Sequence, residues 1–220
     1  REGPLIKIAP IFHILGVLIS MLAVAMMVPA IVDLAVGNPD WQVFVASSTV
    51  TLFIGVAVVL TTRGQATSSL TLRQAFLLTT LSWAVIGLFA ALPFAFADLD
   101  LSFTDAVFES VSGITTTGST VIVGLDFVPP GILMWRALLQ WLGGIGIIIM
   151  ALAVMPMLSV GGMQLFKTEA FDAPDKVVPR ATELASNIGI VYVGLTVIWA
   201  FALYFVGMSG FDAVAHAMTS

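Results

Sequence analysis

A run of small residues near the middle of the chain has the composition of a cation-binding backbone. Residues 113–120 read Gly-Ile-Thr-Thr-Thr-Gly-Ser-Thr, with three consecutive threonines between two glycines. The β-branched threonines are poor helix formers and favour extended backbone, and Gly118 permits left-handed dihedrals that aim successive carbonyls inward. Such a segment predicts a quarter of a four-sided ring of carbonyl oxygens that replaces the water around a cation. The alternative is a packed segment without an ion.

A short helix is expected immediately before this run. Ser102 is a good N-cap for a helix over 102–113, and Asp105 falls in its first turn, where the helix dipole favours a carboxylate. We therefore expect Asp105 to cap the helix rather than to bind an ion. Glu109 and Asp126 either raise the cation concentration at the entrance by their field or are ordinary loop carboxylates, and the sequence leaves both readings open.

The composition places these segments in a membrane protein. Of 220 residues, 59% are apolar and only 10% are charged, whereas a soluble domain has about 25% charged residues. This excludes a soluble enzyme domain and a disordered chain. The net charge of −5, with only eight basic residues, excludes a nucleic-acid binder, and the lack of cysteine excludes disulfides and thiolate metal sites.

Five apolar stretches are long enough to cross a bilayer, which needs about 20 residues per helix. Lys and Arg lie in alternate loops, so the positive-inside rule predicts a cytoplasmic N-terminus. The loop over 98–130 contains neither and is predicted to lie outside. Its segment 102–120 is too short to cross, so we expect it to enter the membrane and return to the outer side. The expected spans are 11–36, 41–62, 73–96, 131–160 and 185–206.

An internal repeat supports this organisation. A shift of 107 residues places Arg73 on Arg180 and Asp105-Ala106-Val107 on Asp212-Ala213-Val214. Repeats of this kind form a site at the interface between copies. We therefore expect an all-α polytopic membrane protein of helix–pore loop–helix repeats, with five transmembrane helices, one complete re-entrant loop and one incomplete one, as part of a longer protein.

The expected parts of the chain follow from these boundaries. Residues 1–66 hold two leading helices, and 67–160 form the first repeat, with a pore helix over 102–113 and a filter over 114–120. Residues 161–184 are a cytoplasmic or interfacial loop, and 185–220 begin a second repeat that stops in its pore helix.

Apart from Arg73 at the start of the third expected span, Arg136 is the only Lys or Arg inside an expected span. Charges within the membrane are often functional, but Arg136 lies about two turns from the outer end. Its side chain can extend to the lipid headgroups or pair with Glu109 or Asp126. We favour a structural role for Arg136, by either of these contacts, over a functional one.

Residues 103–120 and the run 135–146, Trp-Arg-Ala-Leu-Leu-Gln-Trp-Leu-Gly-Gly-Ile-Gly, resemble the TrkH/TrkG potassium-uptake family of the Trk/Ktr/HKT superfamily, as do residues 163–179 and 211–220. The resemblance implies two leading helices and four potassium-channel-like repeats around one pore. The implied filter is Thr115, Thr116, Thr117 and Gly118, with K⁺ bound by the carbonyls of Thr116 and Thr117. Supporting roles are expected for Gly113, Ser119, Asp105 and Glu109.

The resemblance also implies the wider setting. The transported ion is K⁺, no organic cofactor or nucleic acid is involved, and the chain is not an enzyme. The protein lies in a bacterial cytoplasmic (inner) membrane as a homodimer that docks on a cytosolic nucleotide-binding ring, TrkA. The loop over 161–184 is either a docking surface for this ring or a plain linker.

Two other function classes remain as alternatives. One is a cation-coupled secondary transporter with broken helices. The other is an intramembrane serine hydrolase, because Ser110-Val111-Ser112-Gly113 is similar to a serine elbow. That motif needs a glycine two residues before the nucleophile, where Ser110 stands, and no carboxylate is placed to orient His13 or His216.

Overall fold

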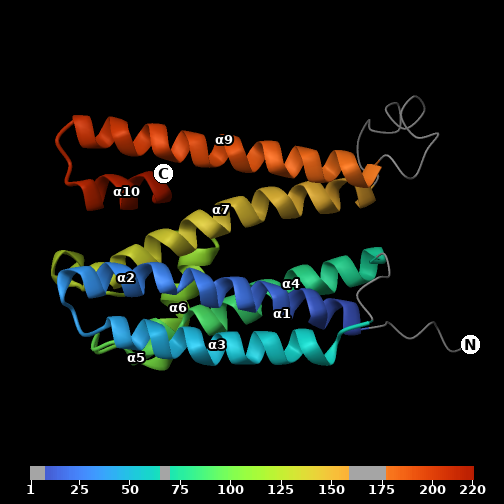
Figure 1. The fold of residues 1–220 in the computed structure, drawn as a ribbon, viewed down its shortest axis with the longest axis horizontal. Coiled ribbons are helices and arrows are strands. Elements are labelled where there is room, and N and C mark those ends of the chain that lie inside the picture. The colour runs from blue at the N-terminus through green and yellow to red at the C-terminus, as the bar shows by residue number, and fades with distance from the viewer. Residues whose placement is uncertain (1–7, 65–69, 159–176) are drawn as a thin grey trace, which may run out of the picture. The chain divides into compact units, whose positions relative to one another are not determined.

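The computed structural model describes residues 8–64, 70–158 and 177–220, which form helices joined by short connections (Figure 1). Five helical stretches within these residues are long and apolar enough to cross a membrane. Each overlaps one of the five predicted spans, and the fourth ends at Met150 rather than at residue 160. Their bounds are Ala9–Val36, Trp41–Thr61, Leu72–Phe96, Pro130–Met150 and Ser186–Phe205. The chain folds as two compact units, the first up to Trp141 and the second from Leu142.

The first span consists of two helices, α1 (Ala9–Ala25) and α2 (Met27–Val36). The interruption at Met26 has a local cause, since Pro29 has no N–H to donate to the carbonyl of Ala25. Gly37 then ends α2 with a left-handed φ of 73°, and α3 (Trp41–Thr61) returns along α1. The two helices pack closely, because a Cβ on Gly55 would collide with Ser20 of α1.

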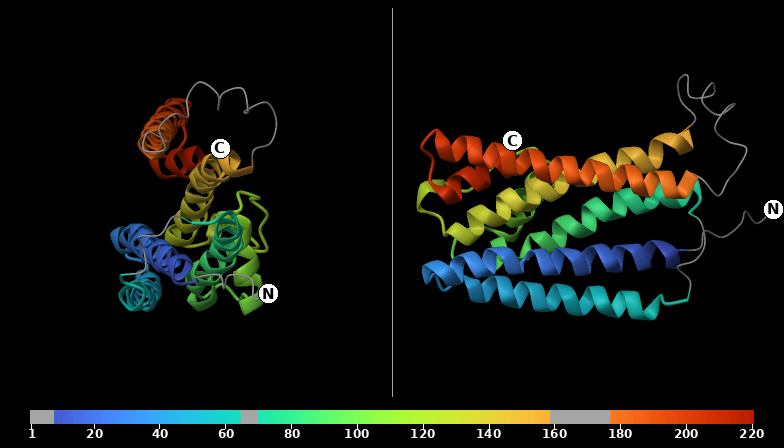
Figure 2. Two further views of the ribbon diagram at one scale, coloured as in Figure 1. Left: turned by 90° about the vertical axis from the view of Figure 1, so that its right-hand side faces the viewer. Right: turned by 45° about the horizontal axis from the view of Figure 1, so that its top comes forward.

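The next span is likewise divided, into α4 (Leu72–Ala90) and α5 (Leu92–Phe96), with Pro93 in the first turn of α5. The side chains of Thr71 and Gln74 form a capping box that begins α4. Helix α1 packs against both α3 and α4, and Figure 2 shows these helices running alongside one another in two further views. This bundle supports the shorter elements of the first unit.

Those shorter elements are α6 (Phe103–Ile114) and a 3₁₀ turn, η1 (Leu125–Phe127), followed by the long α7 (Pro130–Leu158). Twelve residues of α6 rise about 18 Å, well short of the roughly 30 Å hydrocarbon core of a bilayer. The short helix before the threonine run is therefore confirmed, ending one residue later than expected. Its entry into the membrane from the outer side stays a prediction.

The second unit contains the later part of α7, α9 (Val177–Phe205) and α10 (Gly210–Thr219). Helix α9 begins eight residues before the expected span, so the end of the predicted loop over 161–184 is helical. Pro179 falls in the first turn of α9, where proline is tolerated. The remainder of that loop, up to residue 176, lies outside the described residues. Within the unit, the Tyr192 hydroxyl lies close to Gly144, where a Cβ would come within 2.6 Å of it.

Each unit contains a short helix with the same N-cap. In α6, the Ser102 hydroxyl accepts a hydrogen bond from the Asp105 N–H at 3.2 Å. In α10, the Ser209 hydroxyl accepts one from the Asp212 N–H at 3.1 Å. The two serines and the two aspartates are each 107 residues apart, which is the offset of the sequence repeat. The repeated sequence therefore forms a repeated local structure.

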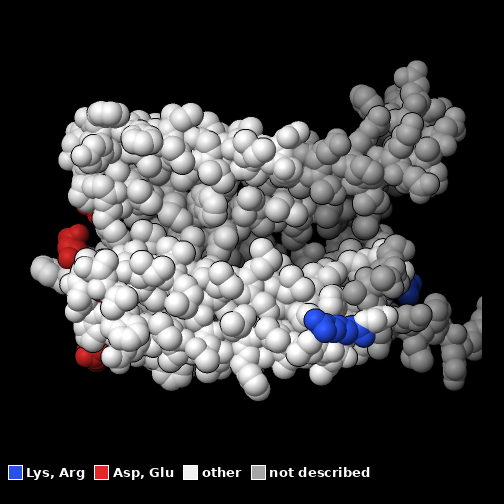
Figure 3. Space-filling model, in the orientation of Figure 1, with Lys and Arg blue, Asp and Glu red and all other residues white. Residues whose placement is uncertain are grey.

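The charged side chains at the helix ends of the first unit are separated by sign. Arg63 follows α3 and Arg73 is in the first turn of α4, whereas Asp40 precedes α3 and Asp98 follows α5. Burial raises the pKa of Asp40, and the negative charge of Asp98 raises it further. On the face drawn in Figure 3, acidic side chains gather at one end and basic ones lie toward the other. This separation supports the predicted orientation.

Candidate ion-binding site

The start of α6 is fixed by a capping box. Besides the bond from the Asp105 N–H to Ser102, the Asp105 carboxylate accepts bonds from the Ser102 N–H at 3.1 Å and the Ser102 hydroxyl at 2.6 Å. Asp105 is thus a cap, as predicted, and lies at the opposite end of α6 from the threonine run. It supports the site by defining where α6 begins.

The middle of α6 packs tightly between two longer helices. The Ser110 hydroxyl is buried and donates to the Gly87 carbonyl of α4. A Cβ on Gly113 would lie 3.1 Å from the Leu139 Cβ of α7. These close approaches fix the position from which the threonine run leaves the helix, and the role of Gly113 in supporting a filter stays a prediction.

The end of α6 is an unusual turn. The N–H groups of Thr116 and Thr117 donate to the carbonyls of Gly113 and Ser112, both at 2.9 Å, which is the pattern of a Schellman motif. Thr116 occupies the left-handed position of this motif, with φ 59°. Glycine is usual there, and a β-branched residue in this conformation is strained by about 1–3 kcal/mol. Such strain clusters at functional sites.

This turn corrects the expectation that all three threonines are extended. Thr115 and Thr116 belong to the turn that ends α6, because the last carbonyls of the helix take their hydrogen bonds from it. Beyond the turn, Gly118 has a φ of 75°, the left-handed conformation predicted for it. Ser119 and Thr120 then run back beside α6, where Ser112 and Glu109 bind them.

Four successive carbonyl oxygens follow the helix without a hydrogen-bond donor. Those of Thr115, Thr116, Thr117 and Gly118 accept no hydrogen bond from the residues that the structure describes. The next carbonyl, that of Ser119, accepts one from the Ser112 hydroxyl at 2.6 Å. Residues 116–118 are also exposed on the first unit. The four predicted filter residues therefore present free carbonyls, which is the chemistry that a cation ligand needs.

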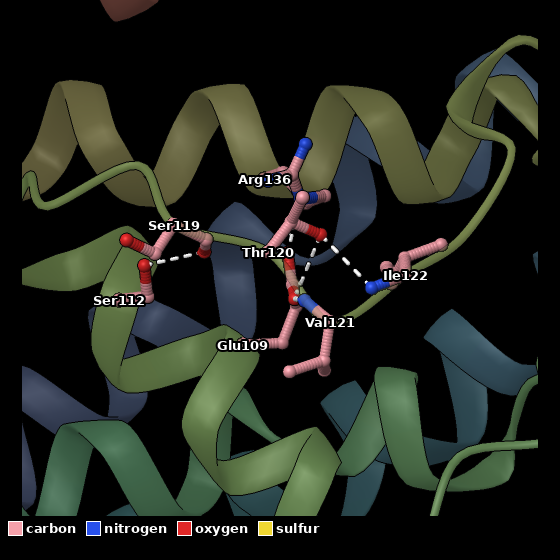
Figure 4. Close-up of polar contacts among 7 residues, drawn as sticks. All are labelled: Glu109, Ser112, Ser119, Thr120, Val121, Ile122 and Arg136. Atoms are coloured by element: carbon pink, nitrogen blue, oxygen red, sulfur yellow. Dashed lines mark hydrogen bonds and ion pairs between the residues drawn. The ribbon is translucent and has the colours of Figure 1, made fainter.

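Glu109 holds the segment that follows these carbonyls. Its Oε2 accepts hydrogen bonds from the Thr120 hydroxyl and the Val121 N–H, each at 3.0 Å (Figure 4). The Thr120 hydroxyl in turn accepts one from the Ile122 N–H at 3.0 Å. Residues 112–119 therefore form a loop closed at one end by the Ser112–Ser119 bond and pinned further along by Glu109.

The other carboxylate oxygen of Glu109 forms an ion pair with Arg136 of α7. The Glu109 side chain is 1% exposed and that of Arg136 is 13% exposed. Of the readings left open for Arg136, the structure supports the ion pair. Glu109 is therefore buried and paired rather than an ordinary loop carboxylate, whereas Asp126 lies exposed in η1.

Trp135, beside Arg136, fixes α7 against the rest of the unit. Its Nε1 donates to the Ala90 carbonyl at 3.0 Å, and its ring meets Phe44 of α3 edge-on with centroids 6.3 Å apart. Both aromatic side chains are fully buried. Sequence reasoning assigned no role to Trp135, or to the bonds of Ser112 and Thr120. The position of Trp135 next to an arginine within a span is the feature of the sequence that could have indicated its packing role.

The serines of the hydrolase alternative are not arranged as nucleophiles. The hydroxyls of Ser110 and Ser112 donate to the carbonyls of Gly87 and Ser119. His13 is hydrogen-bonded to the Thr62 hydroxyl at 3.0 Å instead. In this arrangement the serine hydroxyls support α6 and the loop after it.

Known proteins share this sequence and this fold. A family model described as "TrkH: Cation transport protein" matches residues 41–220. The chain belongs to the TrkH family. Trk system potassium uptake protein TrkI of Halomonas elongata is 46% identical over 212 residues, covering 96% of this chain and 43% of that protein. TrkH of Escherichia coli K12 is 42% identical over 214 residues, covering 96% of this chain and 44% of that protein.

A solved structure gives the same family relationship. The crystal structure of the potassium transporter TrkH from Vibrio parahaemolyticus matches with a TM-score of 0.85 at 39% identity, over 97% of this chain and 42% of that one. The chain thus spans less than half the length of these relatives. The relatives are transport proteins rather than enzymes, which removes the hydrolase alternative.

Proposed function

We propose that this chain forms part of the pore of a Trk-type potassium uptake protein and that residues 115–118 are one quarter of its selectivity filter. The observation that carries the proposal is the set of four free carbonyls directly after α6. Relatives named as potassium uptake proteins, at 42–46% identity, support K⁺ as the ion. The carbonyls of Thr116 and Thr117 would be the main K⁺ ligands.

Conduction through such a site requires no covalent step. K⁺ sheds its water as it enters, and the carbonyl dipoles of the ring replace that water. The free energy of the exchange depends on the number and position of the carbonyls, so the protein's task is to hold them still. Ser112 and Glu109 do this from α6, and Arg136 holds Glu109 from α7.

The remaining parts of the ring would come from further copies of the same structure. Support for this comes from α10, whose Ser209–Asp212 cap repeats that of α6 at an offset of 107 residues. We place residues 1–66 as leading helices, 67–160 as the first repeat and 185–220 as the start of the second. The segments 102–120 and 209–220 then begin as re-entrant loops from the outer side.

The proposed setting follows from charge and family. The N-terminus and the loop over 161–184 would lie in the cytoplasm of a bacterium, with the chain in its inner membrane. The resemblance alone suggests a homodimer and a TrkA-type ring on the cytoplasmic side.

Ion flux into vesicles tests the proposal. The full-length protein in liposomes should admit K⁺ and Rb⁺ down their gradients and admit Na⁺ much more slowly, because the carbonyl ring replaces the water of the larger ions. Uptake of each ion into empty vesicles provides the control. Equal entry of Na⁺ and K⁺ would remove the filter assignment. A fixed, low ratio between K⁺ and a co-transported ion would favour the carrier alternative.

A further inference from the structure

A buried carboxylate connects the leading helices to α7. Asp33 of α2 is 0% exposed and lies within the first apolar span. Its Oδ1 accepts a hydrogen bond at 2.7 Å from the N–H of Gly131, 98 residues further along the chain. Its Oδ2 has no hydrogen-bond partner among the residues described. A carboxylate buried inside a membrane span is expensive, and such residues are functional hypotheses by default.

The bond is made at a position where α7 needs an acceptor. Gly131 is the second residue of α7, and the first four N–H groups of a helix have no acceptor within it. Asp33 supplies one, at the end of the helix where the dipole favours a carboxylate. Gly131 also allows the close approach, because a Cβ there would overlap the Asp33 carboxylate.

A second contact from the leading helices lies one turn further along α7. Phe44 of α3 packs edge-on against Trp135. Arg136, the next residue, is the ion-pair partner of Glu109, which binds Thr120 and Val121 beyond the free carbonyls. A continuous set of contacts therefore runs from Asp33 through the first two turns of α7 to the segment after the threonine run.

We propose that Asp33 is a positioning residue for the filter. By binding the Gly131 N–H it fixes the first turn of α7, and thereby fixes Arg136, Glu109 and the backbone that carries the free carbonyls. The leading helix pair then contributes to ion selectivity without touching the ion. This inference rests on the proposed function, because it assigns Asp33 a role in the same filter.

The first test replaces Asp33 in the full-length protein. Asp33→Ala should lower the K⁺-to-Na⁺ uptake ratio several-fold in liposomes and increase hydrogen exchange of the amides over 115–121, because α7 loses its acceptor. Asp33→Asn keeps a carbonyl for the Gly131 N–H and should restore most of the ratio. Asp98→Asn removes an exposed charge just after α5 and should change neither readout.

A second variant examines the same contact from the other side. Gly131→Ala should displace α7 while Asp33 is present, and it should lower the K⁺-to-Na⁺ uptake ratio about as much as Asp33→Ala does. In the Asp33→Ala background the space is free, so adding Gly131→Ala should have little further effect. Where Asp33→Ala does not accumulate in the membrane, Asp33→Val replaces it, since valine is close to aspartate in size and offers the Gly131 N–H no acceptor.

The outcomes separate this inference from the proposed function. If Gly118→Ala changes the uptake ratio while the Asp33 and Gly131 variants keep the wild-type ratio and exchange, Asp33 has no positioning role and the filter assignment stands. If Gly118→Ala also leaves the ratio unchanged, the filter assignment itself fails. A reduced amount of protein with an unchanged ratio would show that Asp33 serves folding alone.

Discussion

Replacing Gly118 by alanine is expected to reduce the preference for K⁺ over Na⁺ by about tenfold while leaving the amount of protein in the membrane close to normal. Gly118 has a φ of 75°, a conformation that strains any residue with a Cβ by about 1–2 kcal/mol, and the backbone relieves this strain by rotating the peptide groups beside it. A change of about 1.4 kcal/mol in the relative binding of the two ions corresponds to tenfold. The nearest atom to an added Cβ is the Gln140 Oε1 at 3.7 Å, an ordinary contact. The effect would therefore come from rotation of the neighbouring carbonyls and not from a collision.

A matched control lies six residues away. Gly124 has a φ of 72°, and an added Cβ would meet the Phe127 ring at 3.5 Å. Gly124→Ala therefore introduces a similar strain outside the four free carbonyls and should keep the wild-type K⁺-to-Na⁺ ratio. Flux of both ions into liposomes compares the two variants. Equal ratios in Gly118→Ala and the wild type would show that Gly118 does not shape an ion site.

Replacing Glu109 by alanine is expected to reduce both stability and selectivity. The change leaves the Arg136 guanidinium without its partner, and breaking a buried ion pair in this way costs about 3–5 kcal/mol. It also removes the acceptor of the Thr120 hydroxyl and the Val121 N–H, so the segment after the filter is no longer held. Thermal unfolding of the purified full-length protein measures the first effect, and the K⁺-to-Na⁺ flux ratio measures the second.

The partner residue separates these two effects. Arg136→Gln alone should reduce stability more than selectivity, because Glu109 keeps its bonds to Thr120 and Val121. The double variant Glu109→Ala/Arg136→Gln should be more stable than Glu109→Ala, since no unpaired charge remains, yet its selectivity should stay low. Recovery of selectivity in the double variant would contradict the role of Glu109 in holding this segment.

Features of the site that depend on neighbouring residues in the sequence could be predicted from it. Ser102 and Asp105 were predicted to begin a short helix because a capping box is local. The five spans were predicted because length and apolarity decide them. Gly118 was predicted to have a positive φ from its residue type and its place after the threonines.

Features that depend on contacts between distant residues could not be fixed in this way. Sequence reasoning left three readings open for Arg136, because only the fold brings it to Glu109, 27 residues earlier. Asp33 was overlooked, although a carboxylate in an apolar span was a signal in itself. The positive φ of Thr116 could not be predicted, because β-branched residues rarely adopt it. Here the bonds that Ser112 and Glu109 make to the following segment outweigh that conformational preference.

The position of a bound ion tests the central claim most directly. Crystals of the full-length protein grown in Rb⁺, which has a strong anomalous signal and chemistry close to that of K⁺, would locate the ion. The proposed filter predicts an anomalous peak in contact with the carbonyl oxygens of Thr116 and Thr117. A fully occupied pore peak elsewhere with none at these carbonyls, or a threonine run that faces lipid, would contradict it.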